Sequence, residues 1–263
     1  MQRFFVGGVC AGFVLVLSGC PNPNMYTTPR TLDPGRVEWQ VAPEVIGVNY
    51  NVKTAGTDAN GNPTTVQTNV SGVLPMVPSF GARIGVAEGL DVGVRLQNLD
   101  SLAADLKIRL LKGRFDIAVD PGIQGFYASA NSTSFGVFYL HAPVLLGLNF
   151  SDRFTLVVSP GFVYSVTTAT VNDGSGVQGA STASGPMGRL GVGFDFRITE
   201  KFAIHPELTF MQEFGNENLL LWVAGVGFNI GAQPDYSDLA QPAPVAPPAP
   251  TGAPPPPATQ QSL

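Results

Sequence analysis

The chain has 263 residues and carries 19 acidic and 14 basic side chains, which gives a formal net charge of −5. This acidic surplus excludes binding to nucleic-acid phosphates, which requires a basic surface. Charged residues make up 13% of the chain, about half the share usual in soluble domains, whereas glycine and phenylalanine are abundant. Such a composition favours a β structure whose outer face meets lipid.

The chain begins with a segment that has the form of a secretory leader. Arg3 gives a positively charged start. The apolar run over residues 4–17 has the length of a signal peptide and is short for a transmembrane helix. The letters LSGC that end it at Cys20 resemble a bacterial lipobox, where cleavage precedes the cysteine and its thiol receives diacylglycerol. The resemblance implies a lipoprotein signal peptide over residues 1–19 and lipid attachment at Cys20. The alternative is an ordinary signal peptide with an incidental Cys20.

Residues 20–36 are expected to form a disordered tether between this lipid and the folded domain. After Cys20 the sequence reads PNPNMYTTPRTLDPG, which is rich in Pro, Asn and Thr. Pro21 stands where an Asp would imply retention in the inner membrane, so the resemblance implies sorting to the outer membrane. Since Cys10 and Cys20 are the only cysteines, the body can hold neither a disulfide framework nor a cysteine metal site.

From residue 37 to residue 231 apolar side chains alternate with polar or small ones, which is the period of a β-strand. In residues 189–198, for example, the apolar positions all share one face and the charged positions the other. The connections are mostly short and long in turn, as in membrane barrels with tight periplasmic turns and longer outer loops. The pattern predicts strands near 37–52, 73–87, 90–97, 102–111, 115–125, 136–150, 154–166, 186–198, 202–211 and 219–231.

Two stretches, GRLGVGFDFRITEKFAIHPELTF and FGARIGVAEGLDVGVRL, resemble hairpins of Gram-negative outer-membrane β-barrel proteins of the small OmpA-like class. The resemblance covers residues 37–231 and implies an all-β, antiparallel, up-and-down transmembrane barrel of 8–10 strands. Seven prolines in or beside these strands are the strongest evidence against a regular ten-stranded barrel, because each removes a ladder donor. They are Pro43, Pro75, Pro78, Pro121, Pro143, Pro160 and Pro206.

If the apolar faces meet lipid, the charged side chains fill the interior, where they are expected to pair across a narrow lumen. A closed structural barrel is therefore favoured over an open pore. The residues expected inside are Arg83, Arg95, Lys107, Arg109, Arg189, Arg197, Asp91, Asp105, Asp116, Asp120, Asp195 and Glu207.

No catalytic, cofactor or metal site is expected. His141 and His205 are interior residues, and neither their spacing nor that of Ser159 and Glu207 forms a nucleophilic site. The stretch TDANGNPTT places Asp58 and two asparagines, Asn60 and Asn62, like the start of a calcium loop. However, the motif's Gly and its final Glu are missing, so a flexible polar loop is favoured.

The end of the chain, residues 232–263, is predicted to be a disordered tail because its many prolines favour an extended polyproline form. With ten strands both ends of the barrel lie in the periplasm, so the lipid at Cys20 would sit in the inner leaflet. The tail would be a periplasmic spacer or, as the alternative, a docking segment for another envelope protein.

Together these features predict a lipid-anchored outer-membrane β-barrel with an envelope-structural or interaction role and no enzymatic activity. Its partners would be outer-membrane lipid and, through the tail, a periplasmic envelope protein. Three alternatives stay open. One is a small passive solute channel gated by loops 53–72 and 167–185. Another is a lipid-modifying enzyme that uses His141 or His205, and the third is a lipid-tethered soluble barrel around an apolar ligand.

Overall fold

The computed structural model describes residues 22–57, 63–97, 101–130, 133–172, 178–214 and 219–239. Within these ranges the chain forms thirteen β-strands and one short 3₁₀ helix, η1 (Ser237–Leu239). No helix among them is long and apolar enough to cross a membrane. The strands are β1 (Val37–Ala42), β2 (Glu44–Thr57), β3 (Pro63–Pro75), β4 (Ser79–Ala87), β5 (Leu90–Gln97), β6 (Ser101–Leu111), β7 (Phe115–Val119), β8 (Gly122–Ala130), β9 (Thr133–Ser151), β10 (Phe154–Asn172), β11 (Gln178–Thr199), β12 (Phe202–Glu213) and β13 (Leu219–Gly231).

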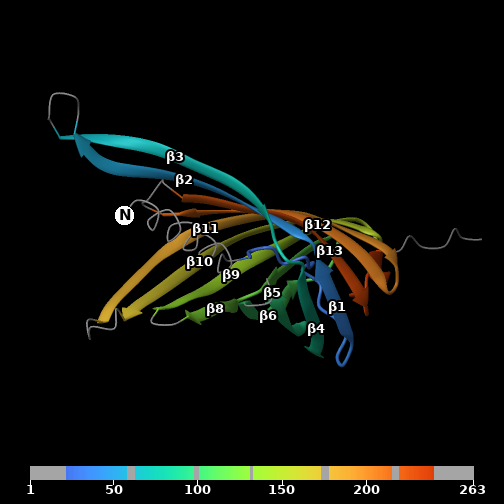
Figure 1. Ribbon diagram of the computed structural model, residues 1–263. Coiled ribbons are helices and arrows are strands. Elements are labelled where there is room, and N and C mark those ends of the chain that lie inside the picture. Colours follow the sequence, from blue (N-terminus) through green and yellow to red (C-terminus); the bar gives the residue numbers. More distant parts are fainter. Residues whose placement is uncertain are drawn as a thin grey trace, which may run out of the picture.

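The strands form one closed antiparallel barrel (Figure 1). Closure comes from β1, which pairs with β13 on one side, Trp39 opposite Ile230, and with β4 on the other. β2 continues β1, β4 continues β3, and β8 continues β7, so the thirteen strands make ten staves. The predicted antiparallel barrel is confirmed, with ten staves. Several strands run past the predicted ranges. Among them, β2 and β3 take up most of residues 53–72, and β10 and β11 most of residues 167–185, which were expected to be loops.

Prolines explain the three broken staves. Pro43 separates β1 from β2, Pro75 and Pro78 stand at the break between β3 and β4, and Pro121 separates β7 from β8. Proline carbonyl groups at these breaks still accept hydrogen bonds from neighbouring strands: Val226 N donates to Pro43 O at 3.2 Å, and Leu106 N donates to Pro121 O at 2.9 Å. A missing proline donor therefore interrupts a ladder without opening the wall. The prolines make the ten-stranded barrel irregular and do not prevent it.

The two ends of the barrel differ in strand length. Tight turns join β4 to β5, β9 to β10 and β11 to β12 at one end, called here the tight-turn end. At the other, the long-hairpin end, β2–β3 and β10–β11 project well beyond the rest of the wall (Figure 1). The rim is low at the β5–β6 hairpin, where Gln97 pairs with Ser101. In membrane barrels of this form the tight turns face the periplasm.

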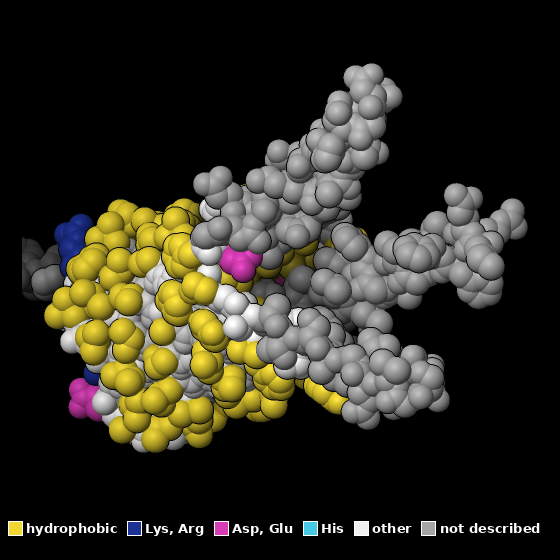
Figure 2. Space-filling view, turned by 90° about the vertical axis from the view of Figure 1, so that its left-hand side faces the viewer, with side chains coloured by type: hydrophobic (Ala, Val, Ile, Leu, Met, Phe, Trp, Pro, Cys, Tyr) yellow, Lys and Arg dark blue, Asp and Glu magenta, His cyan; other side chains and the backbone are white. Residues whose placement is uncertain are grey.

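The outer face is apolar and the lumen is polar. Hydrophobic side chains cover most of the described surface on the face shown in Figure 2. Among the outward side chains, Leu110 is 62% exposed and Phe150 is 54% exposed. Inside, Asp91 and Asp116 have no exposed surface. This orientation suits a barrel solvated by lipid. The alternative of a soluble barrel around an apolar ligand is wrong, because the lumen is lined by charges.

Aromatic rings gather near the tight-turn end of the outer face. Phe154 stacks on Phe150 with ring centroids 5.3 Å apart and on Phe196 at 5.0 Å. On the neighbouring strands β12 and β13, Phe202 stacks on Phe228 at the same end, with ring centroids 6.4 Å apart. Rings at this depth match the interfacial girdle of a membrane barrel.

Two predicted disordered segments are partly folded, which corrects the sequence analysis. Residues 22–36 were expected in a tether. Residues 22–32 are buried inside the barrel, and the exposed residues 33–36 lead into β1 through Gly35, whose positive φ of 75° suits glycine. Residues 232–239, expected in the tail, fold back across the tight-turn end. They are called here the lumen segment and the closing segment. Residues 1–21 and 240–263 lie outside the described residues.

The orientation of the faces can be tested with arginine on the outer surface. Val192 lies midway along β11 and points outward, whereas Ile198 points outward near the tight-turn end. Arginine at the bilayer midplane costs about 2–4 kcal/mol and near the interface about 0–1 kcal/mol. We therefore expect Val192→Arg to lower the free energy of unfolding in lipid vesicles far more than Ile198→Arg. Equal, small losses in a urea titration would contradict the lipid-facing assignment.

Candidate functional site in the barrel lumen

The lumen segment runs antiparallel to β5. Its contacts follow that strand in order: Leu32 N donates to Asp91 Oδ2 at 3.2 Å near the tight-turn end. The carbonyl of Asn24 accepts from Arg95 further along, and Gln97 Nε2 lies 3.4 Å from the carbonyl of Asn22. Asn22 is therefore the part of the segment nearest to the long-hairpin end. The sequence gives no local signal for this path, because the segment has neither strand nor helix period.

Tyr26 fixes the middle of the segment. Its ring is fully buried, and its hydroxyl donates to Glu44 Oε1 at 2.6 Å while accepting from Asn24 Nδ2 at 2.7 Å. Its backbone N–H donates to Glu207 Oε2 at 2.6 Å. These bonds hold Tyr26 at a φ of 49°, which non-glycine residues seldom adopt. On β13 only a glycine fits at position 227, because a Cβ there would lie 2.6 Å from Tyr26 Cβ.

Arg30 joins the lumen segment to the tight-turn end. Its Nε lies 2.7 Å from Asp116 Oδ2 on β7, and its Nη1 lies 2.5 Å from Asp238 Oδ1 in the closing segment. Its guanidinium also packs 4.2 Å from the centroid of the Tyr236 ring, and Arg197 covers the same ring at 3.5 Å. Tyr236 in turn donates from its hydroxyl to Thr28 Oγ1 at 2.8 Å. Segments from both ends of the chain thus close this mouth together.

Charges on the wall form a paired network, as the sequence predicted for most of them. Arg83 bridges Asp91 at 2.5 Å and also pairs with Asp105, while Lys107 Nζ lies 3.4 Å from Asp91 Oδ2 and 2.8 Å from Thr27 Oγ1. Arg109 lies apart from this network, because it pairs with exposed Glu88 at the tight-turn rim.

Acidic groups outnumber basic ones among the buried charges of the described residues. Six basic side chains are buried, of which Arg30 comes from the lumen segment, so the wall supplies five against eight acids. The basic ones are Arg30, Arg83, Arg95, Lys107, Arg189 and Arg197, and the acidic ones are Glu38, Glu44, Asp91, Asp105, Asp116, Asp120, Asp195 and Glu207. Arg30 and the N–H groups of the lumen segment offset part of the wall's negative charge.

The residues weighed for catalysis are dispersed in the lumen. His141 lies on β9 and His205 on β12, and these strands are not neighbours. Ser159 Oγ accepts from Arg189 at 3.3 Å, and that arginine lies 3.7 Å from Glu207 Oε1. His205 instead faces Asp195, with 3.4 Å between Nδ1 and Oδ1. The serine thus contacts a cation, which does not generate a nucleophile. The predicted calcium-like residues Asp58, Asn60 and Asn62, and also Cys20, lie outside the described residues.

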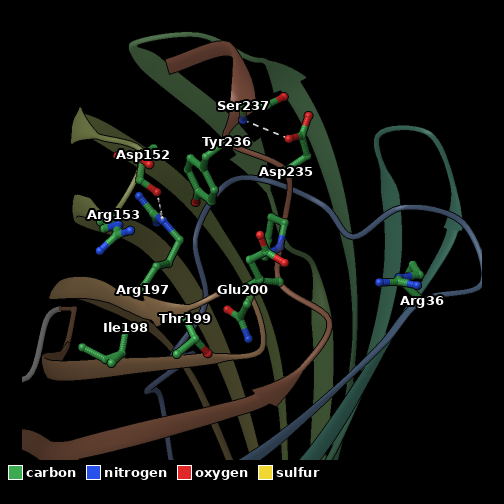
Figure 3. Close-up of a pocket in the computed structure, with 12 residues that line it drawn as sticks. Arg36, Asp152, Arg153, Arg197, Ile198, Thr199, Glu200, Asp235, Tyr236 and Ser237 are labelled. Carbon is green, nitrogen blue, oxygen red and sulfur yellow. Dashed lines mark hydrogen bonds between the residues drawn. The ribbon is translucent and has the colours of Figure 1, made fainter. Parts of the chain in front are cut away.

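Little free space is left between the lumen segment and the wall. Two cavities beside the segment, one next to Asn22 and one next to Gln40, measure about 10 Å³ each, close to the least that holds a water molecule. A larger cavity of about 440 Å³ lies outside the closing segment, at the tight-turn end (Figure 3). There Arg197 Nε donates to the carbonyl of Asp152 at 2.6 Å, and Ser237 N donates to Asp235 Oδ1 at 2.9 Å.

Two carboxylates of the closing segment titrate below their usual range. The backbone and hydroxyl donors of Ser237 lower the pKa of Asp235 to about 2. The hydrogen bond from the Arg30 guanidinium lowers the pKa of Asp238. Both groups are therefore ionised, and hold their donors, throughout the physiological range.

Tyr26, Arg30 and Tyr236 organise this interior, and none of the three was predicted from the sequence to have a structural role. All three lie in segments that were predicted to be disordered because they are rich in proline. The sequence carried no signal for them, because the charges expected inside the barrel were expected to pair with one another.

No protein-family model and no curated protein matches the chain. The outer-membrane protease OmpT of Escherichia coli is 8% identical, with a TM-score of 0.44 over 76% of this chain and 98% of that chain. Neisserial surface protein A is 13% identical, with a TM-score of 0.32 over 73% and 96%. The translocator domain of the autotransporter NalP from Neisseria meningitidis is 11% identical, with a TM-score of 0.40 over 75% and 89%.

Removing the cation of Arg30 tests its role in closing the lumen. Arg30→Met leaves Asp116 without its buried partner, and breaking such a pair costs about 3–5 kcal/mol. We expect a loss of that size in the free energy of unfolding, measured by urea titration in lipid vesicles. The double variant Arg30→Met/Asp116→Asn should lose less than the sum of the single variants. Additive losses would show that the two side chains are not coupled.

Acid should release the closing segment. Because the folded-state pKa values of Asp235 and Asp238 lie below the unfolded value of 3.8, their contribution is complete above that pH and disappears as the pH falls toward about 2. We expect hydrogen exchange in residues 232–239, corrected for intrinsic rates, to accelerate over this window. An Asp235→Asn/Asp238→Asn variant should already be deprotected at neutral pH. Full protection in that variant would contradict the assignment.

Proposed function

We propose that the protein is a lipid-anchored outer-membrane barrel with an envelope-structural or interaction role, closed by its own N-terminal segment and without enzymatic activity. The apolar outer face and polar lumen support placement in a membrane. The LSGC sequence supports lipid at Cys20, and Pro21 supports sorting to the outer membrane.

The observation that carries the structural role is the filled lumen. Tyr26 and Arg30 contact the wall through Glu44, Glu207 and Asp116, so the segment is bound on opposite sides of the barrel. The two cavities beside it measure about 10 Å³ each, which supports a lumen closed to solutes along the described residues. Residues 240–263 would then extend from the closing segment into the periplasm, as a spacer or as a docking segment for an envelope protein.

Fractionation of a Cys20→Ala variant tests the anchoring. We expect it to lose incorporation of radiolabelled palmitate and yet to stay in the membrane pellet after alkaline carbonate, with heat-modifiable gel mobility, because the barrel itself spans the bilayer. Cys10→Ala is the matched control and should keep the label. Release of Cys20→Ala by carbonate would mean that the lipid was the only anchor.

A solute channel is the second candidate, favoured by the acidic surplus of the wall. Replacing residues 22–32 by Gly and Ser removes Arg30 and leaves five buried basic side chains against eight acidic ones. We expect this variant to conduct in planar bilayers with preference for cations, while the intact protein stays closed. Stable conductance from the intact protein would favour the channel over the structural role.

A further inference from the structure

The direction of the lumen segment fixes the end of the barrel toward which its first described residue, Asn22, lies. From Leu32 to Asn22 the contacts climb β5 from Asp91 to Gln97, the last described residue of that strand. Asn22 is 2% exposed and therefore still inside the barrel. Asn22 thus lies at the end of the described segment nearest to the long-hairpin end, opposite to the end where β1 begins.

Cys20 is close to this point because only Pro21 separates it from Asn22. Two residues span at most about 7 Å, so the Cα of Cys20 lies within that distance of the Cα of Asn22. The tight-turn end lies beyond Tyr26 and Arg30, through a lumen with no room for acyl chains. A lipid on Cys20 therefore starts close to the long-hairpin rim and far from the tight-turn end.

The rim next to Asn22 is the low one. The β5–β6 hairpin ends at Gln97 and Ser101, whereas β8 continues from Phe126, the partner of Ser101, to Ala130. Gln124 on β8 lines the small cavity beside Asn22 from the lumen side. The residues before and after Gln124, Ile123 and Gly125, lie on the outer face of the same wall.

An apolar groove of about 320 Å³ lies on that outer face, directly across the wall from Asn22. The small residues Gly125 and Ala104 form its floor, and bulky, exposed side chains border it. The bordering side chains are Leu102, Ile123, Tyr127 and Phe138.

We propose that the lipid of Cys20 crosses the β5–β6 rim, enters the outer leaflet and lays an acyl chain in the β6–β8 groove. The inference rests on the lipidation proposed above. It replaces the expectation of a lipid in the inner leaflet, which assumed that the chain reaches β1 directly from the periplasm. The occupant is thus a covalent part of this chain, and the protein would be anchored from the cell surface.

A short epitope tag inserted between Cys20 and Asn22 tests the direction, with the same tag after Leu239 as the matched control. We expect antibody to stain the N-terminal tag on intact cells and the control only after permeabilisation, with palmitate label and heat-modifiable mobility retained in both. Staining of the N-terminal tag only after permeabilisation, with label retained, would overturn the outward path and leave lipidation standing. Surface staining without label would overturn lipidation and with it the lipid site.

The groove is tested separately with a photo-reactive residue in place of Tyr127. After irradiation, mass spectrometry should find the lipidated N-terminal peptide linked to the β8 peptide. A photo-reactive residue at Phe210, an outward aromatic position on β12, is the control and should give no such product. Equal linkage at both positions would place the acyl chain in the bulk leaflet and refute the groove.

Discussion

The structure depends on one constraint: carboxylates buried in a narrow lumen need hydrogen-bond donors, and the wall alone does not hold enough cations. Eight acidic side chains face five basic ones from the wall. An unpaired charge in such a place costs several kcal/mol, so the lumen is stable only when something else supplies donors. The lumen segment does so with Arg30 and with backbone N–H groups aimed at Asp91 and Glu207.

The same constraint explains why the two chain ends meet. Asp116 and Asp238 both bind Arg30, the first from the wall and the second from the closing segment. The ring of Tyr236 lies between two guanidinium groups, which favours its burial although it stands in a proline-rich context. Binding at the mouth is therefore cooperative, since each segment completes the site of the other.

Alternation along the chain was sufficient to predict the wall, because a period of two places every charged residue of a strand on one side. Pro43 and Pro121 were read as evidence against a regular barrel, and their effect was confined to breaks within staves. The content of the lumen could not be predicted in the same way. The lumen segment has no repeating period, and its contacts, such as Tyr26 with Glu207, join residues far apart in sequence. The charge imbalance becomes visible only when the faces are known.

The path of the lumen segment inside a closed barrel also affects how the protein resists a pulling force. Between Leu32 and Asn22 the segment runs along β5 toward the long-hairpin end, so a pull on Asn22 in that direction acts along the barrel axis. Such a load falls on many lateral contacts at once, from Gln97 to Asp116, and does not open them one after another as in peeling an edge strand. The barrel would therefore hold the segment against a pull along its axis, and the buried ring of Tyr26 would add steric resistance.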